Sequence, residues 1–245
     1  MLKLKSNLRS FGTFQTMLKQ IPNDLKGRKT SSQEWLRRQL KDPYVEKAKI
    51  ENYRSRSAFK LIEIDDKFKF LTPGKIVLDC GASPGGWTQV ACQRCNANEN
   101  DSNAPVGTVI GIDLIKIRPI PGATLLSPMD FTSDVSQKKL QEILDSRLVD
   151  VFLSDMAPNA TGMASLDHEQ IMELTQEALR FSLQVSSPGS VFLVKIWNGG
   201  RLNSFLEDLK RFYLKVQIVK PPASRKESPE IYVLGKDFKG LKKRK

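Results

Sequence analysis

Short apolar runs alternate with amphipathic stretches along most of the chain, and this alternation predicts its elements. Seven apolar runs of four or five residues predict β-strands: Ile76–Cys80, Thr108–Ile112, Ala123–Leu126, Val149–Leu153, Ser190–Val194, Lys215–Val219 and Ile231–Leu234. Between them, apolar residues at helical spacing predict helices over Gly86–Cys95, Ser133–Leu144, Asp167–Val185 and Asn203–Phe212. Strands that alternate with helices predict an α/β fold with a doubly wound, mostly parallel sheet.

Three further helices are predicted ahead of the first strand. A capping box, Ser31-x-x-Glu34, begins a helix over 31–40, and a second helix covers about 43–52. The third runs from Ser57 to Leu71, where its apolar positions recur at spacings of three and four. Two non-helical segments complete the pattern, a polar surface loop over 96–106 and a turn over Ser187–Gly189.

Charge is unevenly distributed along the 245 residues, which carry a formal net charge of +12. Residues 1–60 hold 15 Lys and Arg against 5 Asp and Glu, residues 236–245 hold 6 against 1, and residues 61–235 hold 18 against 21. Basic ends on a nearly neutral domain favour a polyanionic partner such as nucleic acid, although charge runs also occur as plain solvated surface. No apolar run approaches the roughly 18 residues of a membrane span, so we expect no membrane-spanning segment.

The first 30 residues are basic, hold a single acid, Asp24, and carry apolar residues at roughly helical spacing. A basic, amphipathic and acid-poor start is typical of a mitochondrial transit peptide. The alternative is a retained arm that binds nucleic acid. Of the two, we expect the transit peptide.

A glycine-rich turn, Gly81-Ala82-Ser83-Pro84-Gly85-Gly86-Trp87, follows the first predicted strand. Glycines let a ligand approach the main chain closely, and in an open α/β sheet such a turn lies where small ligands bind. The turn lacks both the Gly-Lys-Ser/Thr ending of a phosphate loop and the spacing of the dinucleotide fingerprint. It therefore predicts either a site for an adenosine-type cofactor such as S-adenosylmethionine or a purely structural turn.

Polar residues stand at the ends of four predicted strands: Asp79, Asp113, Asp155 and Lys195. The carboxyl ends of parallel strands share one edge of the sheet, so these side chains can converge on one pocket. Asp113 follows the second strand, where an acid commonly accepts hydrogen bonds from cofactor ribose hydroxyls. Asp130 either accepts a hydrogen bond from an adenine amino group or caps the helix that follows, and spacing alone favours neither.

Lys195 interrupts an apolar run, and lysine is almost never fully buried without a partner. If burial keeps its amine neutral, Lys195 suits a general base, whereas a nearby acid would keep it charged. The simpler alternative is a lysine whose stem packs at a strand end while its ammonium reaches water.

The three cysteines, Cys80, Cys92 and Cys95, are too few for a disulfide scaffold. Cys92 and Cys95 have the spacing of a metal or redox pair, but the sequence has no second pair and its single histidine, His168, is distant. We interpret the cysteines as incidental thiols.

Five segments occur in an order that resembles one family: Ser57-Ala58-Phe59-Lys60-Leu61, Gly81–Trp87, Ser154–Asn159, Val194-Lys195 and Glu230-Ile231-Tyr232. Over about residues 42–239 the chain thereby resembles the FtsJ/RrmJ family of S-adenosylmethionine-dependent RNA 2′-O-ribose methyltransferases. Within that family, Asp155–Gly162 with Leu166–His168, and Ala223–Ser228, look most like the mitochondrial large-subunit rRNA (uridine-2′-O)-methyltransferases.

The resemblance implies a Rossmann-like, seven-stranded methyltransferase sheet and a catalytic tetrad of Lys60, Asp155, Lys195 and Glu230. Lys195 would take the proton of the attacking ribose hydroxyl or mainly position that hydroxyl. Asp155 and Lys60 would orient Lys195 and the ribose hydroxyl, and Glu230 would tune the charge of the site. The implied cofactor-binding residues are Gly81, Pro84, Gly85, Gly86, Trp87, Asp113, Asp130 and Asp155, and the scheme requires no metal.

These observations divide the chain into a basic leader or arm over 1–41, a methyltransferase domain over 42–239 and a basic tail over 240–245. Within the leader, the transit peptide would cover about residues 1–30. We expect a monomer in the mitochondrial matrix that methylates a uridine of large-subunit rRNA. The substrate is either the rRNA itself or a precursor of the large ribosomal subunit. The alternatives are a cap or tRNA 2′-O-ribose methyltransferase, and a ribosome-assembly factor that acts mainly by binding RNA.

Overall fold

The computed structural model describes residues 42–158 and 161–241. The chain divides after Asp42, and the unit Pro43–Lys245 contains all the helices and strands given below. The predicted transit peptide, the predicted helix over 31–40 and Asn159 lie outside the described residues. None of the described helices is both long and apolar enough to cross a bilayer.

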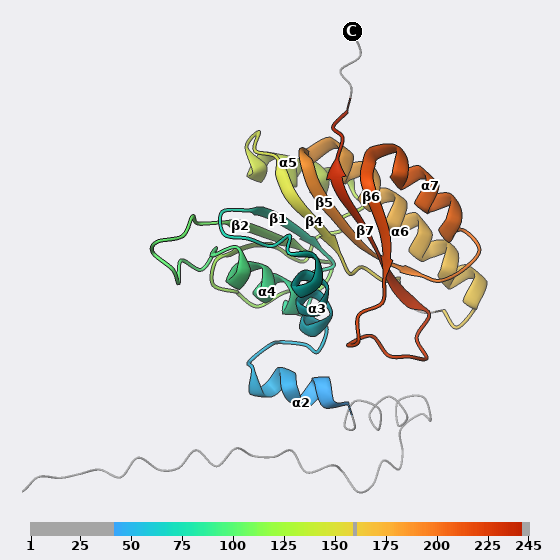
Figure 1. Cartoon of the computed structure of the whole chain (residues 1–245), viewed down its shortest axis with the longest axis horizontal. Coiled ribbons are helices and arrows are strands. Elements are labelled where there is room, and N and C mark those ends of the chain that lie inside the picture. The colour runs from blue at the N-terminus through green and yellow to red at the C-terminus, as the bar shows by residue number, and fades with distance from the viewer. Residues whose placement is uncertain (1–41, 159–160, 242–245) are drawn as a thin grey trace, which may run out of the picture. The chain divides into compact units, whose positions relative to one another are not determined.

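Seven strands form one sheet: β1 (Ile76–Cys80), β2 (Thr108–Ile112), β3 (Ala123–Leu126), β4 (Val149–Ser154), β5 (Ser186–Trp197), β6 (Tyr213–Val219) and β7 (Glu230–Phe238). Their order across the sheet is β3-β2-β1-β4-β5-β7-β6 (Figure 1). Strands β1 to β5 pair in parallel, whereas β7 runs antiparallel to β5 and to β6. The predicted α/β fold with a seven-stranded, mostly parallel sheet is therefore confirmed.

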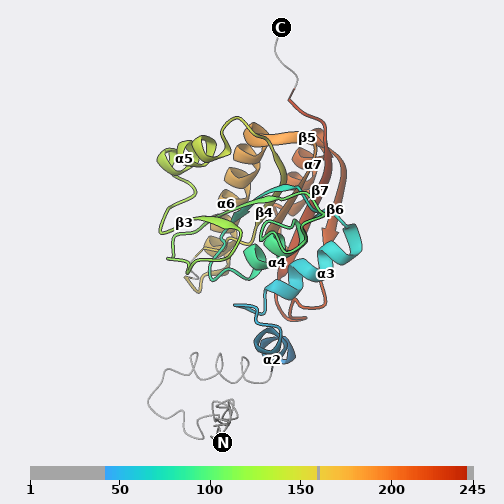
Figure 2. The same cartoon turned by 90° about the vertical axis from the view of Figure 1, so that its left-hand side faces the viewer.

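The described residues form six helices: α2 (Pro43–Ile50), α3 (Ala58–Phe68), α4 (Gly86–Arg94), α5 (Asp134–Leu144), α6 (Ala164–Val185) and α7 (Leu202–Phe212). Helices α3 and α4 share one apolar cluster with the sheet, and α5, α6 and α7 share a second. Figure 2 accordingly shows α3 and α5 on opposite sides of the strands. Helix α2 packs beside α3, where the rings of Tyr44 and Phe59 lie 5.6 Å apart.

The central strands are buried on both faces, as parallel strands covered by helices must be. In β1 and β2 every residue after the first is buried. Those buried positions explain why β1 and β2 are readable as continuous apolar runs. The one charged exception in β1 is Asp79, which is fully buried.

Helix α3 is shorter than its apolar spacing predicts. It ends at Phe68, and Lys69 then adopts a left-handed conformation with φ of 51°. The carboxylate of Asp65 accepts the N–H groups of Phe70 and Leu71 over 2.9 and 2.8 Å. The predicted extension to Leu71 is wrong because this buried carboxylate stabilises a chain reversal in place of another helical turn.

The predicted turn at Ser187–Gly189 is an irregular part of β5. Helix α6 ends at Val185, and β5 begins at the next residue. The pairing of β4 with β5 jumps from Val149–Ser186 to Val151–Val191, so the residues between bulge out of the ladder.

The antiparallel direction of β7 decides which residues lie at the edge of the sheet where the parallel strands end. Strand β5 ends at this edge and β7 begins there, because Trp197 pairs with Glu230 and Lys195 pairs with Tyr232. The first residues of β7 therefore lie beside the last residues of β5.

Candidate active site

Four charged side chains, the predicted tetrad, form two ion pairs at this edge. Lys195 Nζ lies 3.0 Å from Asp155 Oδ1 and also donates to the main-chain carbonyl of Asp155. Lys60 Nζ, from α3, lies 2.6 Å from Glu230 Oε1. The four side chains are only 9% to 16% exposed, so both pairs are largely shielded from water.

Tyr232 lies between the two ion pairs. Its hydroxyl donates to Asp155 Oδ1 over 2.9 Å, and Lys60 Nζ lies 5.8 Å from its ring centroid. The ring packs against Trp87 with centroids 5.6 Å apart. The sequence pattern predicts no role for Tyr232, because an aromatic residue in an apolar strand is typical of a core. The available signal is its position two residues after Glu230, which places both side chains on one face of the strand.

The charges around Asp155 keep its carboxyl ionised. Burial alone would raise its pKa, but the positive charges of Lys195 and Lys60, with hydrogen bonds from Lys195 and Tyr232, lower the pKa below its ordinary value. Burial and the negative charges of Asp155 and Glu230 raise the pKa of Tyr232 well above its ordinary value. Tyr232 therefore keeps its proton and remains a donor to Asp155.

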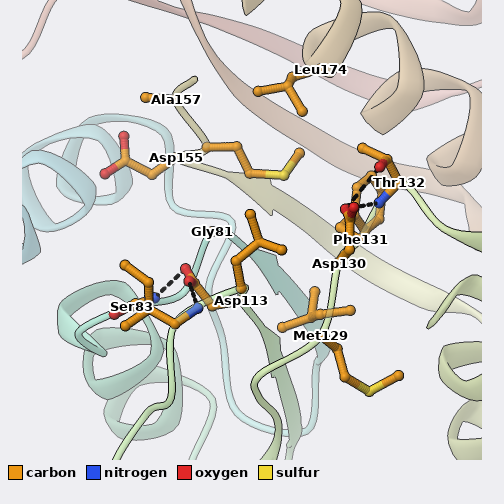
Figure 3. Close-up of a pocket in the computed structure, with 14 residues that line it drawn as sticks. Gly81, Ser83, Asp113, Met129, Asp130, Phe131, Thr132, Asp155, Ala157 and Leu174 are labelled. Atoms are coloured by element: carbon orange, nitrogen blue, oxygen red, sulfur yellow. Dashed lines mark hydrogen bonds between the residues drawn. The ribbon is translucent and has the colours of Figure 1, made fainter. Parts of the chain in front are cut away.

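A cavity of about 350 Å³ opens beside Asp155. This volume lies in the range of about 300 to 1,000 Å³ that is usual for small-molecule sites. The lining combines polar residues with apolar ones such as Leu114, Met129, Phe131 and Leu174. Figure 3 shows Asp113 and Ser83 on one side of the cavity and Asp130 and Thr132 on another.

Asp113 is fixed by the main chain around it. Its Oδ2 accepts the N–H of Ser83 over 2.8 Å, and its Oδ1 accepts the N–H of Ile115 over 2.7 Å. A carboxylate has about four acceptor sites, so Asp113 retains capacity for the hydroxyls of a ligand. Its predicted contact with a cofactor ribose stays a prediction that this position allows.

Asp130 also lines the cavity, and it does not cap α5. Its Oδ1 accepts the N–H and the hydroxyl of Thr132 over 2.9 and 2.8 Å. The cap of α5 is Ser133, whose hydroxyl oxygen accepts the N–H of Ser136. The helix-cap alternative for Asp130 is therefore wrong, and its predicted contact with adenine stays a prediction.

The glycine-rich turn reaches the cavity at Gly81 and Ser83. Gly81 has φ of +80°, and a Cβ there would lie 2.8 Å from the main-chain nitrogen of Met156, so only glycine fits. Gly86 and Trp87 face the segment that leads into α3 instead. A Cβ on Gly86 would lie 2.4 Å from Ser55 Oγ, and the Trp87 indole N–H donates to the carbonyl of Ser57 over 2.8 Å.

Four predicted cofactor residues are absent from the cavity lining: Pro84, Gly85, Gly86 and Trp87. Their contact with a cofactor stays a prediction. In the structure, Gly86 and Trp87 hold the turn against the segment that leads into α3, the helix that carries Lys60.

Asp79 lies beneath the site and does not line the cavity. Its Oδ2 accepts the hydroxyl of Thr88 over 2.7 Å, and its Oδ1 has no hydrogen-bond partner in the described part of the chain. Burial, opposed by the Thr88 hydrogen bond and reinforced by the charges of Asp155 and Asp113, raises the pKa of Asp79 to about 7. The expected convergence on one pocket therefore holds for Asp113 and Asp155 and fails for Asp79, and Lys195 is absent from the cavity lining and reaches this group only through its ion pair with Asp155.

The three cysteines are free and buried. Burial raises the pKa of Cys92 and of Cys95 to about 12, so neither forms a thiolate at neutral pH. Across residues 42–158 and 161–241, no group of three or more His, Cys, Asp or Glu side chains is placed to hold a metal ion.

Comparisons with known proteins point to one family. The sequence matches the FtsJ-like methyltransferase family over residues 53–238. It is 55% identical over 222 residues to "rRNA methyltransferase 2, mitochondrial" of Drosophila melanogaster, which covers 91% of this chain and 89% of that protein. It is 49% identical over 215 residues to "Ribosomal RNA large subunit methyltransferase E" of Parvibaculum lavamentivorans, with 87% and 84% covered. A crystal structure of a ribosomal RNA methyltransferase from Plasmodium falciparum matches with a TM-score of 0.65 and 35% identity, covering 77% of this chain and 100% of that one.

Proposed function

The chain belongs to the FtsJ-like methyltransferase family, and on this premise we propose that it transfers a methyl group from S-adenosylmethionine to the ribose 2′-hydroxyl of a uridine in mitochondrial large-subunit rRNA. The observation that carries the proposal is the pair of buried ion pairs, Lys195–Asp155 and Lys60–Glu230, beside a cavity of small-molecule size. Methyl transfer to an alcohol needs alignment and removal of one proton, and this arrangement supplies groups for both.

The lining of the cavity fits an adenosine-type cofactor. Gly81 lines the cavity and, without a Cβ, lets the main chain of Met156 lie against it, while Asp113 and Asp130 offer acceptors to ribose hydroxyls and an adenine amino group. Leu114 and Phe131 supply apolar surface for a purine ring. When bound, the cofactor supplies a methyl group on a positively charged sulfur, which is already a strong donor.

Lys195 is the residue that handles the hydroxyl proton. An ammonium carries three protons, and the carboxylate and carbonyl oxygens of Asp155 accept two of them. The third position on Nζ remains for the ribose hydroxyl. As an ammonium, Lys195 orients this hydroxyl by donating a hydrogen bond to it, without accepting its proton. Only as a neutral amine, whose lone pair is free to take it, would Lys195 remove the hydroxyl proton, and a bound S-adenosylmethionine would supply the methyl group. Lys60 supports this step as a second positive charge, paired with Glu230.

RNA phosphates are contacted by exposed lysines near the α2–α3 segment. Lys47 and Lys49 on α2 are 54% and 65% exposed. The arginines of this segment have another role, because Arg54 donates to three main-chain carbonyls and Arg56 to one. The basic tail over 240–245 is a further candidate, of which residues 242–245 lie outside the described part, whereas Lys236 and Lys239 donate to main-chain carbonyls. Phosphate contacts give salt-dependent, sequence-insensitive affinity.

We place the protein in the mitochondrial matrix. This placement is supported by the name of the Drosophila relative, "rRNA methyltransferase 2, mitochondrial", and by the basic, acid-poor composition of residues 1–30. Imaging a full-length fusion beside one that lacks residues 1–30 tests it, and mitochondrial import of the truncated fusion would contradict the targeting role.

The function is tested by methyl transfer in vitro. Purified protein, S-adenosylmethionine labelled in its methyl group and a large-subunit rRNA transcript or a purified subunit precursor should give labelled RNA. Lys195→Ala should abolish transfer while calorimetry still detects cofactor binding. Lys236→Ala is the matched control, because Lys236 lies on β7 and its ammonium donates to the carbonyl of Phe68, away from the tetrad. Full activity of Lys195→Ala would remove Lys195 from the reaction.

Mapping of 2′-O-methyl groups in RNA from cells with and without the protein separates the alternatives. Loss of one mark in large-subunit rRNA supports the proposal, whereas loss of a mark in tRNA or in a cap contradicts the proposed substrate. If Lys195→Ala restores ribosome assembly without restoring the mark, the protein acts mainly as an assembly factor.

A further inference from the structure

Ser224 contacts the same carboxylate oxygen as Lys60. Its hydroxyl donates to Glu230 Oε1 over 2.8 Å, and Lys60 Nζ lies 2.6 Å from that oxygen. Ser224 is 5% exposed and belongs to the loop between β6 and β7. One nearly buried oxygen thus accepts two donors, and the hydroxyl restricts the direction from which the carboxylate meets the ammonium.

The main chain beside Ser224 is held independently of this hydrogen bond. The N–H of Ala223 donates to Glu63 Oε2 over 2.7 Å, and Arg56 donates to the carbonyl of Ala223. The Tyr44 hydroxyl donates to Glu63 Oε1 over 2.8 Å. Side chains from α3 and from the segment before it therefore bind both polar main-chain groups of Ala223, and a tyrosine of α2 holds Glu63 in turn, so the loop does not depend on the Ser224 hydroxyl for its position.

A second serine of this loop also contacts Glu230, but in a different way. Ser228 Oγ accepts the main-chain N–H of Glu230 over 3.2 Å, so it holds the start of β7 and not the carboxylate. Of these two serines, Ser224 is the one that acts on the charged group.

We propose that Ser224 is a positioning residue for methyl transfer, which orients the Glu230 carboxylate and, through it, the Lys60 ammonium. The inference rests on the proposed function and adds a residue outside the tetrad. Without the hydroxyl, Glu230 Oε1 would keep Lys60 as its donor, and the ion pair could rotate about the side-chain torsions of both residues. Misplacement of charged groups at a reacting centre reduces rate more than binding, so the expected change is in kcat.

Ser224→Ala and the control Ser190→Ala test this directly. Ser190 is 3% exposed, and its hydroxyl has no hydrogen-bond partner among residues 42–158 and 161–241, so the control also removes a buried hydroxyl. Ser224→Ala should lower kcat for rRNA methylation about 10-fold, the usual effect of losing a hydrogen bond to a charged group. The Kd for S-adenosylmethionine and the KM for RNA should stay within about twofold of wild type, and Ser190→Ala should stay within about twofold in kcat.

A double-mutant cycle with Glu230→Ala separates positioning from general loss of structure. If Ser224 acts through Glu230, then adding Ser224→Ala to Glu230→Ala should change kcat by no more than about twofold. If Ser224 only supports the fold, the same 10-fold decrease should recur in both backgrounds.

The outcomes are distinct. A wild-type protein that transfers no methyl group to RNA would overturn the proposed function and this inference together. Active wild type with unchanged kcat in Ser224→Ala, or with equal decreases in both backgrounds of the cycle, would overturn the inference alone. A decrease in kcat confined to the Glu230-containing background supports it.

Discussion

Replacing Lys195 with methionine should both stop methyl transfer and destabilise the protein, because it leaves the buried carboxylate of Asp155 without its partner. The two charged atoms lie 3.0 Å apart, which at an effective dielectric constant of about 20 corresponds to an attraction of about 5.5 kcal/mol. The side chains of Lys195 and Asp155 are 9% and 16% exposed, so water screens little of that attraction. Tyr232 still donates to Asp155 in the variant, and Lys60 still contributes positive charge. We therefore expect a loss of about 3 kcal/mol, the lower end of the usual cost of breaking a buried pair.

The double variant Lys195→Met/Asp155→Asn should recover most of this stability without recovering activity. It removes both charges, and the amide oxygen of an asparagine at position 155 can still accept the Tyr232 hydroxyl. Neutral replacements of a buried ion pair are often as stable as the pair itself, so we expect the double variant within about 1 kcal/mol of wild type.

Urea unfolding at neutral pH, together with the methyl-transfer assay, measures both effects. In a domain of this size, about 3 kcal/mol also corresponds to a fall in Tm of about 6 to 12 °C. The pKa of Asp155 is lowered in the folded protein, so the pair stabilises the fold above the ordinary range of a carboxyl pKa and loses its contribution as the pH falls through the folded-state value. The difference between wild type and Lys195→Met should therefore shrink in acid. A single variant within about 1 kcal/mol of wild type, as for a surface pair, would refute the reasoning, as would a double variant no more stable than the single one.

Three further predictions concern Asp79, which lies beneath the cavity, and Gly81 and Asp113, which line it. Because burial raises the pKa of Asp79 to about 7, the folded protein holds a proton that the unfolded chain releases at lower pH, and stability should fall as the pH rises from about 5 to 7. Relative to wild type, Asp79→Asn should gain about 3 kcal/mol in urea unfolding between pH 5 and pH 8, and a constant difference would contradict this. Gly81→Ala should cost about 2 kcal/mol in urea unfolding and weaken cofactor binding, because its φ is +80° and its Cβ would meet Met156, whereas Gly200→Ala, whose Cβ meets nothing within 4 Å, should be neutral. Asp113→Asn should raise the Kd for S-adenosylmethionine about 10-fold by calorimetry, because it turns an acceptor that binds two main-chain N–H groups into a partial donor, and an unchanged Kd would remove Asp113 from the cofactor site.

The sequence predicted most of the fold because parallel strands covered on both faces must be continuously apolar. The bounds of β1, β2 and β3 agree with the predicted runs, since each of these short strands is read from its own residues. The errors arose where a distant or buried polar group decided the local structure. The carboxylate of Asp65 ends α3 before Leu71, and the ladder with β4 absorbs Ser187–Gly189 into β5.

The site was predictable in part for a similar reason. Asp155 and Lys195 interrupt or follow apolar runs, so the cost of burying their charges makes them visible in the sequence. Lys60 and Glu230 are not visible in this way, because on a helix and at the start of a strand they read as surface charges, and only the resemblance to a family assigned them roles.

The sequence by itself determined the α/β class, the position of the glycine-rich turn and the residues that carry charge to one edge of the sheet. The tertiary structure alone decided which of those charges meet. Residues as far apart as Lys60 and Glu230 form an ion pair because β7 runs antiparallel to β5 and begins where β5 ends, next to α3. The tertiary structure also showed that Tyr232 lies between the two ion pairs, that Ser224 donates to Glu230, and that Asp79 lies beneath the cavity. Hydrophobic periodicity is a local property of the chain, whereas the pairing of buried charges depends on strand direction and packing between segments that are distant in sequence.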